Sequence, residues 1–174
     1  AFGAVSKAVI ISLEKAGVVK PEISGKDKRS LGDGNKRSPA CFSTSNHWEI
    51  TVEGKKLAGS AQRRLSGAFL QHGSILLDWD PELAHSLFRY SSESEQAQGL
   101  KSLILGTSTL KEVLSIKPEW REVAHCFVEG FQNTFPGYWQ PETLNSLETE
   151  LVKEYLEENE QISFMKGNYK LIDF

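Results

Sequence analysis

The stretch from residue 48 to residue 79 constrains the fold most strongly, because its apolar and polar residues alternate. Trp48, Ile50 and Val52 fall on every second position, which is the period of a β-strand with one buried face. Glu53-Gly54 follows and has the composition of a tight turn. The pattern therefore predicts a β-hairpin whose second strand begins directly after this turn.

A second turn at Ser66-Gly67 separates residues 57–62 from an apolar segment at residues 68–79. The three segments together predict an antiparallel meander. The middle strand is unusual, because residues 58–61 read Ala-Gly-Ser-Ala and offer almost no side-chain bulk. Such a strand is weak unless another group must approach its backbone closely.

Helical patterns flank the meander. Residues 2–17 place apolar side chains at a spacing near 3.6 and end at Gly17, which predicts an amphipathic helix. After Pro81 the chain is helical in pattern, with expected helices at 81–90, 107–116, 118–135 and 141–159. We expect Thr107 or Ser108 to cap the second of these. The fold class is α/β (α+β), with the meander packed against helices.

Residues 20–40 contain prolines, glycines and basic residues but almost nothing to bury, so we expect a long mobile loop. The 174 residues carry a formal charge of −3, which argues against nucleic-acid binding by the chain as a whole. Two cysteines, no apolar leader and no run long enough to span a membrane favour free thiols in the cytoplasm, away from membranes.

Two motifs carry a family resemblance. Gly54–Gln62 reads GKKLAGSAQ, and Gln71–Leu76 reads QHGSIL, in this order and separated by the second turn. They resemble paired strand motifs of the lipoate-protein ligase and octanoyltransferase family, which has the biotin/lipoate ligase-like fold. The resemblance implies that residues 1–117 are the C-terminal portion of the acyltransferase catalytic domain. Residues 118–174 would then form a helical region packed on it.

Family members also carry an Arg-Arg-x-[Ser/Thr]-Gly-Gly-Gly-type motif upstream, and nothing in residues 1–40 matches it. The chain begins with Ala1 and opens directly into a helical pattern. We therefore expect a piece of a longer or divided protein, which would have little activity alone.

The resemblance is greatest to the cysteine-dependent branch, which has Cys-aromatic before the hairpin and then Trp/Tyr-Glu. Here these are Cys41-Phe42 and Trp48-Glu49. The implied reaction moves octanoyl from octanoyl-acyl carrier protein to a lipoyl-domain protein such as glycine cleavage H protein. Two alternatives stay open, namely an ATP-dependent lipoate-protein ligase, which needs no thiol, and a non-catalytic module that binds acylated carrier domains.

Cys41 is the expected nucleophile, because a thiolate accepts an acyl group and forms a thioester similar in energy to the donor. Its pKa must fall from about 8.5, and nearby cations such as Lys36, Arg37 and Lys56 are a recognised cause. Cys126 lies among apolar residues at helical spacing and is expected to be a structural thiol.

Lys56 matches the family lysine that holds the acyl carbonyl, and an ammonium there would stabilise a tetrahedral oxyanion. Lys55 should face the opposite side of the strand. The residues that the resemblance assigns to the acyl pocket are Gly59, Ser60, Ala61, Gln62, His72 and Gly73. We expect no metal and no cofactor, because the four histidines lack the spacing of a ligand set and no nucleotide loop is recognisable.

Overall fold

The computed structural model describes residues 2–24 and 49–158 of the chain. The chain divides into two compact units, Ala1–Pro136 and Gly137–Phe174, which are described separately below. Cys41, most of the loop predicted at 20–40, and the tail after residue 158 lie outside the described residues. The division predicted between residues 117 and 118 concerns the limits of the catalytic domain and stays a prediction.

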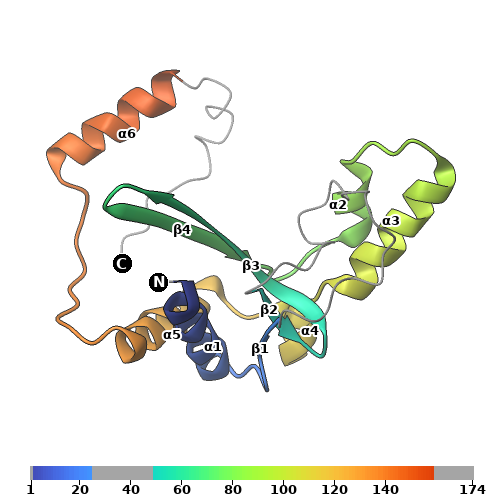
Figure 1. The fold of residues 1–174 in the computed structure, drawn as a ribbon, viewed down its shortest axis with the longest axis horizontal. Coiled ribbons are helices and arrows are strands. Elements are labelled where there is room, and N and C mark those ends of the chain that lie inside the picture. Colours follow the sequence, from blue (N-terminus) through green and yellow to red (C-terminus); the bar gives the residue numbers. More distant parts are fainter. Residues whose placement is uncertain (1, 25–48, 159–174) are drawn as a thin grey trace. The chain divides into compact units, whose positions relative to one another are not determined.

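The first unit contains a four-stranded antiparallel sheet in the order β1-β2-β3-β4 (Figure 1). Its strands are β1 (Glu22–Ile23), β2 (Ile50–Val52), β3 (Lys55–Leu65) and β4 (Ala68–Ile75). The predicted meander is confirmed as β2-β3-β4. Both turns use a glycine in the left-handed region, with φ of 80° at Gly54 and 78° at Gly67, a conformation that side chains disfavour.

The sheet differs from the prediction at its two ends. β1 lies inside the segment expected to be a loop, where it pairs with β2 while the Ser24 N–H donates to the Glu49 carbonyl at 2.8 Å. Two residues are too few to show an alternating pattern. β4 ends at Ile75 rather than at Trp79, because the chain bends where the Trp79 N–H donates to the Asp78 carboxylate at 3.0 Å.

Five helices belong to the described part of the first unit. They are α1 (Phe2–Lys15), α2 (Pro81–Ser86), α3 (Glu93–Gly106), α4 (Leu110–Leu114) and α5 (Trp120–Thr134). The first predicted helix is confirmed as α1, and Gly17 follows it with φ of 95°. α2 is shorter than predicted, but it has the expected proline in its first turn, and the Asp80 carboxylate caps it.

α3 was not among the predicted helices, because its sequence is polar and only Leu103 is buried. A capping pattern marks its start, since the Ser92 hydroxyl accepts from the Glu95 N–H at 3.2 Å. The predicted cap of the next helix was wrong, because Thr109 caps α4 by accepting from Glu112 N–H. Thr107 is instead bridged to Lys56 of β3, which moves the helix start along the chain.

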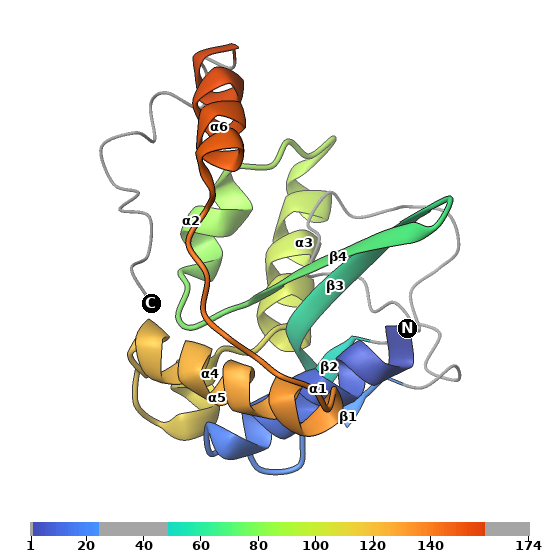
Figure 2. The same cartoon turned by 90° about the vertical axis from the view of Figure 1, so that its left-hand side faces the viewer.

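α1 and α5 lie side by side and cover one face of the sheet (Figures 1 and 2). They approach closely where Gly130 of α5 meets Ser12 of α1, since a Cβ added to Gly130 would lie 2.7 Å from the Ser12 backbone nitrogen. The buried apolar core beneath them comprises Leu13, Val18, Ile50, Val52, Leu57, Ala58, Leu110 and Val123. This core fixes the sheet against the helices and so holds β3 in place.

The second unit contains α6 (Ser146–Glu158). The helix predicted from residue 141 begins five residues later, because Asn145 caps it and its side chain accepts from the Glu148 N–H at 2.9 Å. The Asn145 N–H in turn donates to the Glu148 carboxylate at 2.9 Å. None of the helices within residues 2–24 and 49–158 is long and apolar enough to cross a membrane.

Candidate functional site

A β-bulge in β3 decides where the motif lysine points. Lys56 pairs with Thr51 of β2, whereas Ala58 pairs with the adjacent residue Ile50. Leu57 is therefore the extra residue of the bulge, and the alternation of side chains changes phase across it. Lys56 consequently lies on the opposite face from Ala58 and on the same face as Gly59.

The side chains of Lys56 and Glu49 form a buried ion pair on this face. The distance from Lys56 Nζ to Glu49 Oε1 is 2.6 Å, and the two side chains are only 6% and 5% exposed. The lysine side chain passes over Gly59, because a Cβ there would lie 3.0 Å from Lys56 Cε and 3.3 Å from Nζ. Glycine at this position thus leaves the space that the lysine occupies.

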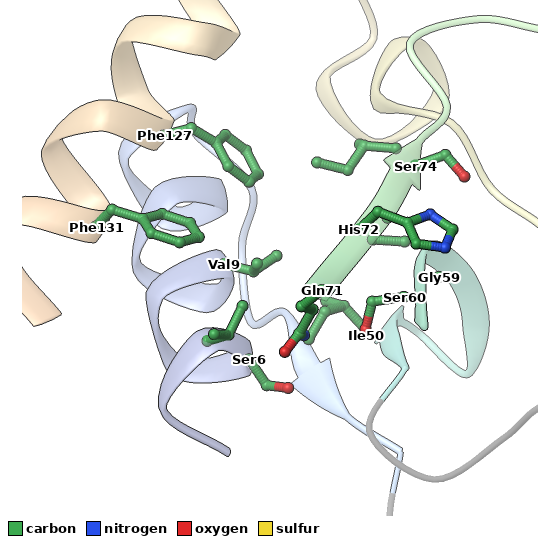
Figure 3. Close-up of a pocket in the computed structure, with 14 residues that line it drawn as sticks. Ser6, Val9, Ile50, Gly59, Ser60, Gln71, His72, Ser74, Phe127 and Phe131 are labelled. Atoms are coloured by element: carbon green, nitrogen blue, oxygen red, sulfur yellow. The ribbon is translucent and has the colours of Figure 1, made fainter. Parts of the chain in front are cut away.

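We call this surface the lysine face and define it by Lys56, Gly59, Ala61, His72 and Ser74. The register pairs Gly59 with Ser74 and Ala61 with His72, so these residues share one side of the hairpin. Figure 3 shows the His72 ring and the Ser74 hydroxyl pointing away from Phe127 and Phe131 of α5. The lysine face thus combines a buried ammonium with a strip of two residues that add almost no bulk.

The opposite surface, the helix face, carries Ser60, Gln62, Gln71 and Gly73. Ser60 pairs with Gly73, and Gln62 donates from its amide to the Gln71 carbonyl oxygen at 2.9 Å. Between this face and the helices lies a cavity of about 290 Å³, whose lining residues are drawn in Figure 3. Its lining comprises Val5, Ser6, Val9, Ile50, Ala58, Gly59, Ser60, Gln71, His72, Gly73, Ser74, Ile75, Phe127 and Phe131.

The six residues expected to form one acyl pocket are therefore divided between two faces. Gly59, Ala61 and His72 lie on the lysine face, whereas Ser60, Gln62 and Gly73 lie on the helix face. Neighbouring residues of a strand point to opposite sides, so a continuous motif cannot line one pocket with every side chain. Lys56 does not border the helix-side cavity. The assignment of these six residues to acyl binding stays a prediction.

Of the other predicted residues, Lys55 and Cys126 lie in the described part of the chain, and Cys41 does not. Lys55 pairs with Val52 and is half-buried on the side of β3 away from Lys56, as alternation predicts. Cys126 is a half-buried free thiol on α5. Cys41 lies outside the described residues.

The sequence pattern gave Glu49 no role, although Trp48-Glu49 marks one branch of the family. A bulge leaves little trace in an alternating pattern, so the pairing of Glu49 with Lys56 could not be read from spacing. Thr107 was also missed as a neighbour of Lys56: it is 1% exposed, and the following Ser108 N–H donates to the Lys56 carbonyl at 2.9 Å. Thr107 and Ser108 thus hold the β3 backbone in place at Lys56.

The arrangement on the lysine face suits one kind of chemistry. A lysine ammonium held in a buried setting can donate to a carbonyl oxygen and stabilise the negative charge that develops there during acyl transfer. The lysine side chain fills the space over Gly59, and the exposed Ala61, two residues further along the same side of β3, adds little bulk beside it. Among residues 2–24 and 49–158, His, Cys, Asp and Glu side chains form no group of three that could hold a metal ion.

The similar proteins of known sequence that are described next share one name. Octanoyltransferase LipM of Brevibacillus brevis is 40% identical over 117 residues, which is 67% of this chain and 42% of that protein. Octanoyltransferase LipM of Bacillus subtilis is 36% identical over 127 residues, covering 73% of this chain and 45% of that protein. The chain thus spans less than half the length of these curated relatives.

Solved structures show the same fold. A bipartite lipoate protein ligase of Thermoplasma acidophilum, studied with its E2 lipoyl domain, matches with a TM-score of 0.69 at 18% identity, covering 90% of this chain and 53% of that chain. Lipoate-protein ligase A bound with ATP matches with a TM-score of 0.64, also at 18% identity, over 90% of this chain and 54% of that one. The predicted α/β ligase-like fold is confirmed.

Residues 1–132 match the family model described as the lipoyl protein ligase A/B catalytic domain. This range contains the whole sheet, both sequence motifs and the Lys56–Glu49 pair. The family resemblance seen in the two strand motifs is therefore confirmed over most of the chain, and the chain belongs to the lipoyl protein ligase A/B catalytic domain family.

Proposed function

We propose that the protein carrying this chain is an octanoyltransferase that moves an octanoyl group from acyl carrier protein to a lysine of a lipoyl-domain protein. Glycine cleavage H protein is the proposed acceptor. The observation that carries the proposal is the buried Lys56 ammonium beside Gly59, on the strand that bears the family motif. The relatives named octanoyltransferase LipM support the same activity.

The reaction would proceed in two acyl transfers. The Cys41 thiolate attacks the thioester carbonyl of the carrier, the bond from carbonyl carbon to carrier sulfur breaks, and the carrier thiol leaves with a proton. The acceptor lysine amine then attacks the acyl-Cys41 carbonyl, the bond from carbonyl carbon to Cys41 sulfur breaks, and the nitrogen gives one proton to water, so that an amide and the Cys41 thiolate remain. Both steps pass through a tetrahedral oxyanion, which the Lys56 ammonium would stabilise.

The octanoyl chain would lie along the lysine face. Ala61 would leave room there beside the lysine, and His72, which pairs with Ala61, would border the chain from β4. Burying a saturated chain is favourable by roughly 0.8 kcal/mol per CH₂, so the length of the available strip selects the length of the acyl group. No cofactor is needed, because the donor thioester is already activated.

Recognition of the two partners would use basic residues near the site, since acyl carrier protein and lipoyl domains present acidic surfaces. Arg63 and Arg64 are exposed on β3 beyond the lysine face. Complementary charge chiefly raises association rates and lowers the rate of wrong encounters. We place the reaction in the cytoplasm.

Intact-mass spectrometry tests this function most simply. After incubation of the full-length protein with octanoyl-acyl carrier protein, we expect one octanoyl adduct that hydroxylamine removes. The adduct should be absent from Cys41→Ser and present in the control Cys126→Ser, because a helix thiol has no assigned role. An adduct on Cys126, or one that survives in Cys41→Ser, would remove Cys41 from the mechanism.

ATP dependence separates the transferase from the ligase. We expect transfer from the carrier thioester without ATP and no transfer from free octanoate with ATP. The opposite pair of results would assign the protein to the ATP-dependent ligases. Lipoate-protein ligase A bound with ATP has the same fold. Tight binding of acylated carrier without turnover would support the non-catalytic module.

A further inference from the structure

The buried partner of Lys56 has no role in the two acyl transfers described above. Glu49 immediately precedes β2, and its Oε1 atom lies 2.6 Å from the Lys56 ammonium nitrogen. Its side chain is 5% exposed, so this carboxylate is removed from water almost completely. A contact of this length between charged groups is a strong hydrogen bond.

Buried ion pairs are a poor source of stability. Removing two charges from water costs several kcal/mol per ion, and a well-packed apolar pair of similar volume is often as stable or more so. The apolar core of this unit lies directly beside the pair, since Ile50 and Leu57 are both members of it. The retention of two charges at this position therefore requires a reason other than packing.

The local backbone is built around the pair. The bulge at Leu57 turns Lys56 onto the face that Glu49 occupies, and Gly59 removes the Cβ that would press against the lysine Cε at 3.0 Å. The Ser108 N–H and the bridge to Thr107 hold the lysine backbone from the other side. Three separate features of β3 thus place one lysine side chain.

We infer that Glu49 is a positioning residue that holds the Lys56 ammonium over Gly59, aimed at the acyl carbonyl. This inference rests on the proposed function of Lys56. A lysine side chain has four rotatable bonds and a compact charge, so an ammonium without a fixed hydrogen-bond partner samples many positions. One N–H bond to Glu49 fixes the nitrogen and the directions of its other two N–H bonds. Glu49 itself does not touch the substrate.

The first test removes the charge of Glu49 without changing its size. In the full-length protein, Glu49→Gln should lower kcat about tenfold to a hundredfold, the range expected when a catalytic group is misplaced by about 1 Å. The KM for octanoyl-carrier protein should change little, because Glu49 makes no substrate contact. Glu49→Asp should recover part of kcat, and thermal melts should show both variants folded.

A double mutant separates positioning from a general structural effect. If Glu49 acts only through Lys56, then Glu49→Gln should have no further effect on kcat in a Lys56→Ala background. An equal loss of kcat in both backgrounds would overturn the inference, because Glu49 would then act independently of the lysine.

A third measurement does not depend on activity. Brief acetylation with an N-hydroxysuccinimide ester, followed by peptide mass spectrometry, should label Lys56 slowly in the wild type and at least several-fold faster in Glu49→Gln. Lys55 is the matched control, since its labelling should be equal in both proteins. Unchanged Lys56 labelling would overturn the positioning role even in an active enzyme. Faster labelling in a protein that transfers no octanoyl would retain the positioning and reject the proposed function.

Discussion

The two faces of the β3-β4 hairpin are made from the same short motif but differ in what they contain. The helix face is turned toward α1 and α5 across a mostly apolar cavity of about 290 Å³. The lysine face carries a buried ion pair, a glycine and an alanine, with an exposed histidine beside them. One strand therefore borders a cavity on one side and holds a buried charge on the other.

The cavity and the buried charge of this hairpin thus lie on different faces. The cavity on the helix face has apolar walls and no lysine or arginine in its lining. The lysine face carries a buried ammonium, which is the group best suited to stabilise a developing negative charge. We therefore propose that acyl transfer takes place on the lysine face.

The largest expected effect comes from two adjacent lysines on opposite sides of β3. Lys56→Ala should lower the rate of octanoyl transfer on the order of 10² to 10³, the usual cost of removing an oxyanion donor. Lys55→Ala should leave the rate unchanged and alter stability by less than about 0.5 kcal/mol. Transfer assays and thermal melts of both variants decide the matter. A slow Lys55→Ala variant would mean that the faces are exchanged.

The sequence could predict this contrast only in part. Alternation placed Lys55 and Lys56 on opposite sides, and the motif selected Lys56. Alternation alone would also have placed Lys56 with Ala58, because the bulge at Leu57 depends on pairing between strands that no local pattern records. The six residues predicted to bind the acyl group came from both faces for a related reason, since consecutive residues of a strand motif point to opposite sides of the sheet.

The contact between α1 and α5, the helices opposite the helix face, should be sensitive to packing rather than to charge. Gly130→Ala places a Cβ 2.7 Å from the Ser12 backbone nitrogen, so α1 and α5 must separate. Overpacking of this kind costs about 1–3 kcal/mol of unfolding free energy. Gly106→Ala is the control, because a Cβ there meets nothing within 4 Å. Urea denaturation of both variants measures the difference, and equal stabilities would show that the crossing of the two helices is loose.

Adding bulk to neighbouring positions of β3 compares the two faces directly. Ala61→Leu extends side-chain atoms over the lysine face and should lower kcat/KM for octanoyl-carrier protein about tenfold, because extra carbons compete with the acyl chain. Ser60→Leu points to the helix-side cavity and should change kcat/KM less than about twofold. Steady-state kinetics with donors of different chain length would check both. Equal losses would mean that the acyl group contacts both faces.

The smallest expected effect lies on the exposed side of the helix layer. The Lys15 ammonium hydrogen-bonds Glu129 at 2.6 Å and lowers the pKa of that carboxyl. A lowered pKa in the folded state stabilises the protein above the ordinary glutamate pKa of about 4.3, and this contribution disappears as pH falls through the folded value. Glu129→Gln should therefore be slightly less stable than wild type at pH 7 and equal to it in strong acid. Denaturation curves at both pH values would measure this, and a difference that persists in acid would exclude the ion pair as its cause.

The fold was more predictable than the site. Strong alternation and turn glycines gave the meander, and an amphipathic pattern gave α1. The polar helix α3 was missed because Leu103 is its one buried residue, and the two-residue β1 was missed because its pairing with β2, rather than a local pattern, defines it. The contact of Glu49 with Lys56 could not be predicted from the sequence, because it depends on the bulge at Leu57 and on the absence of a Cβ at Gly59.

The central claim is that the acyl group lies on the lysine face, and a crystal structure of the full-length protein with bound octanoate tests it most directly. We expect a carboxylate oxygen of octanoate, standing in for the acyl carbonyl oxygen, within about 3 Å of Lys56 Nζ, and the carbon chain over Ala61 and beside His72. An octanoate chain lying instead between β4 and the rings of Phe127 and Phe131, with Lys56 bound only to Glu49, would contradict the account.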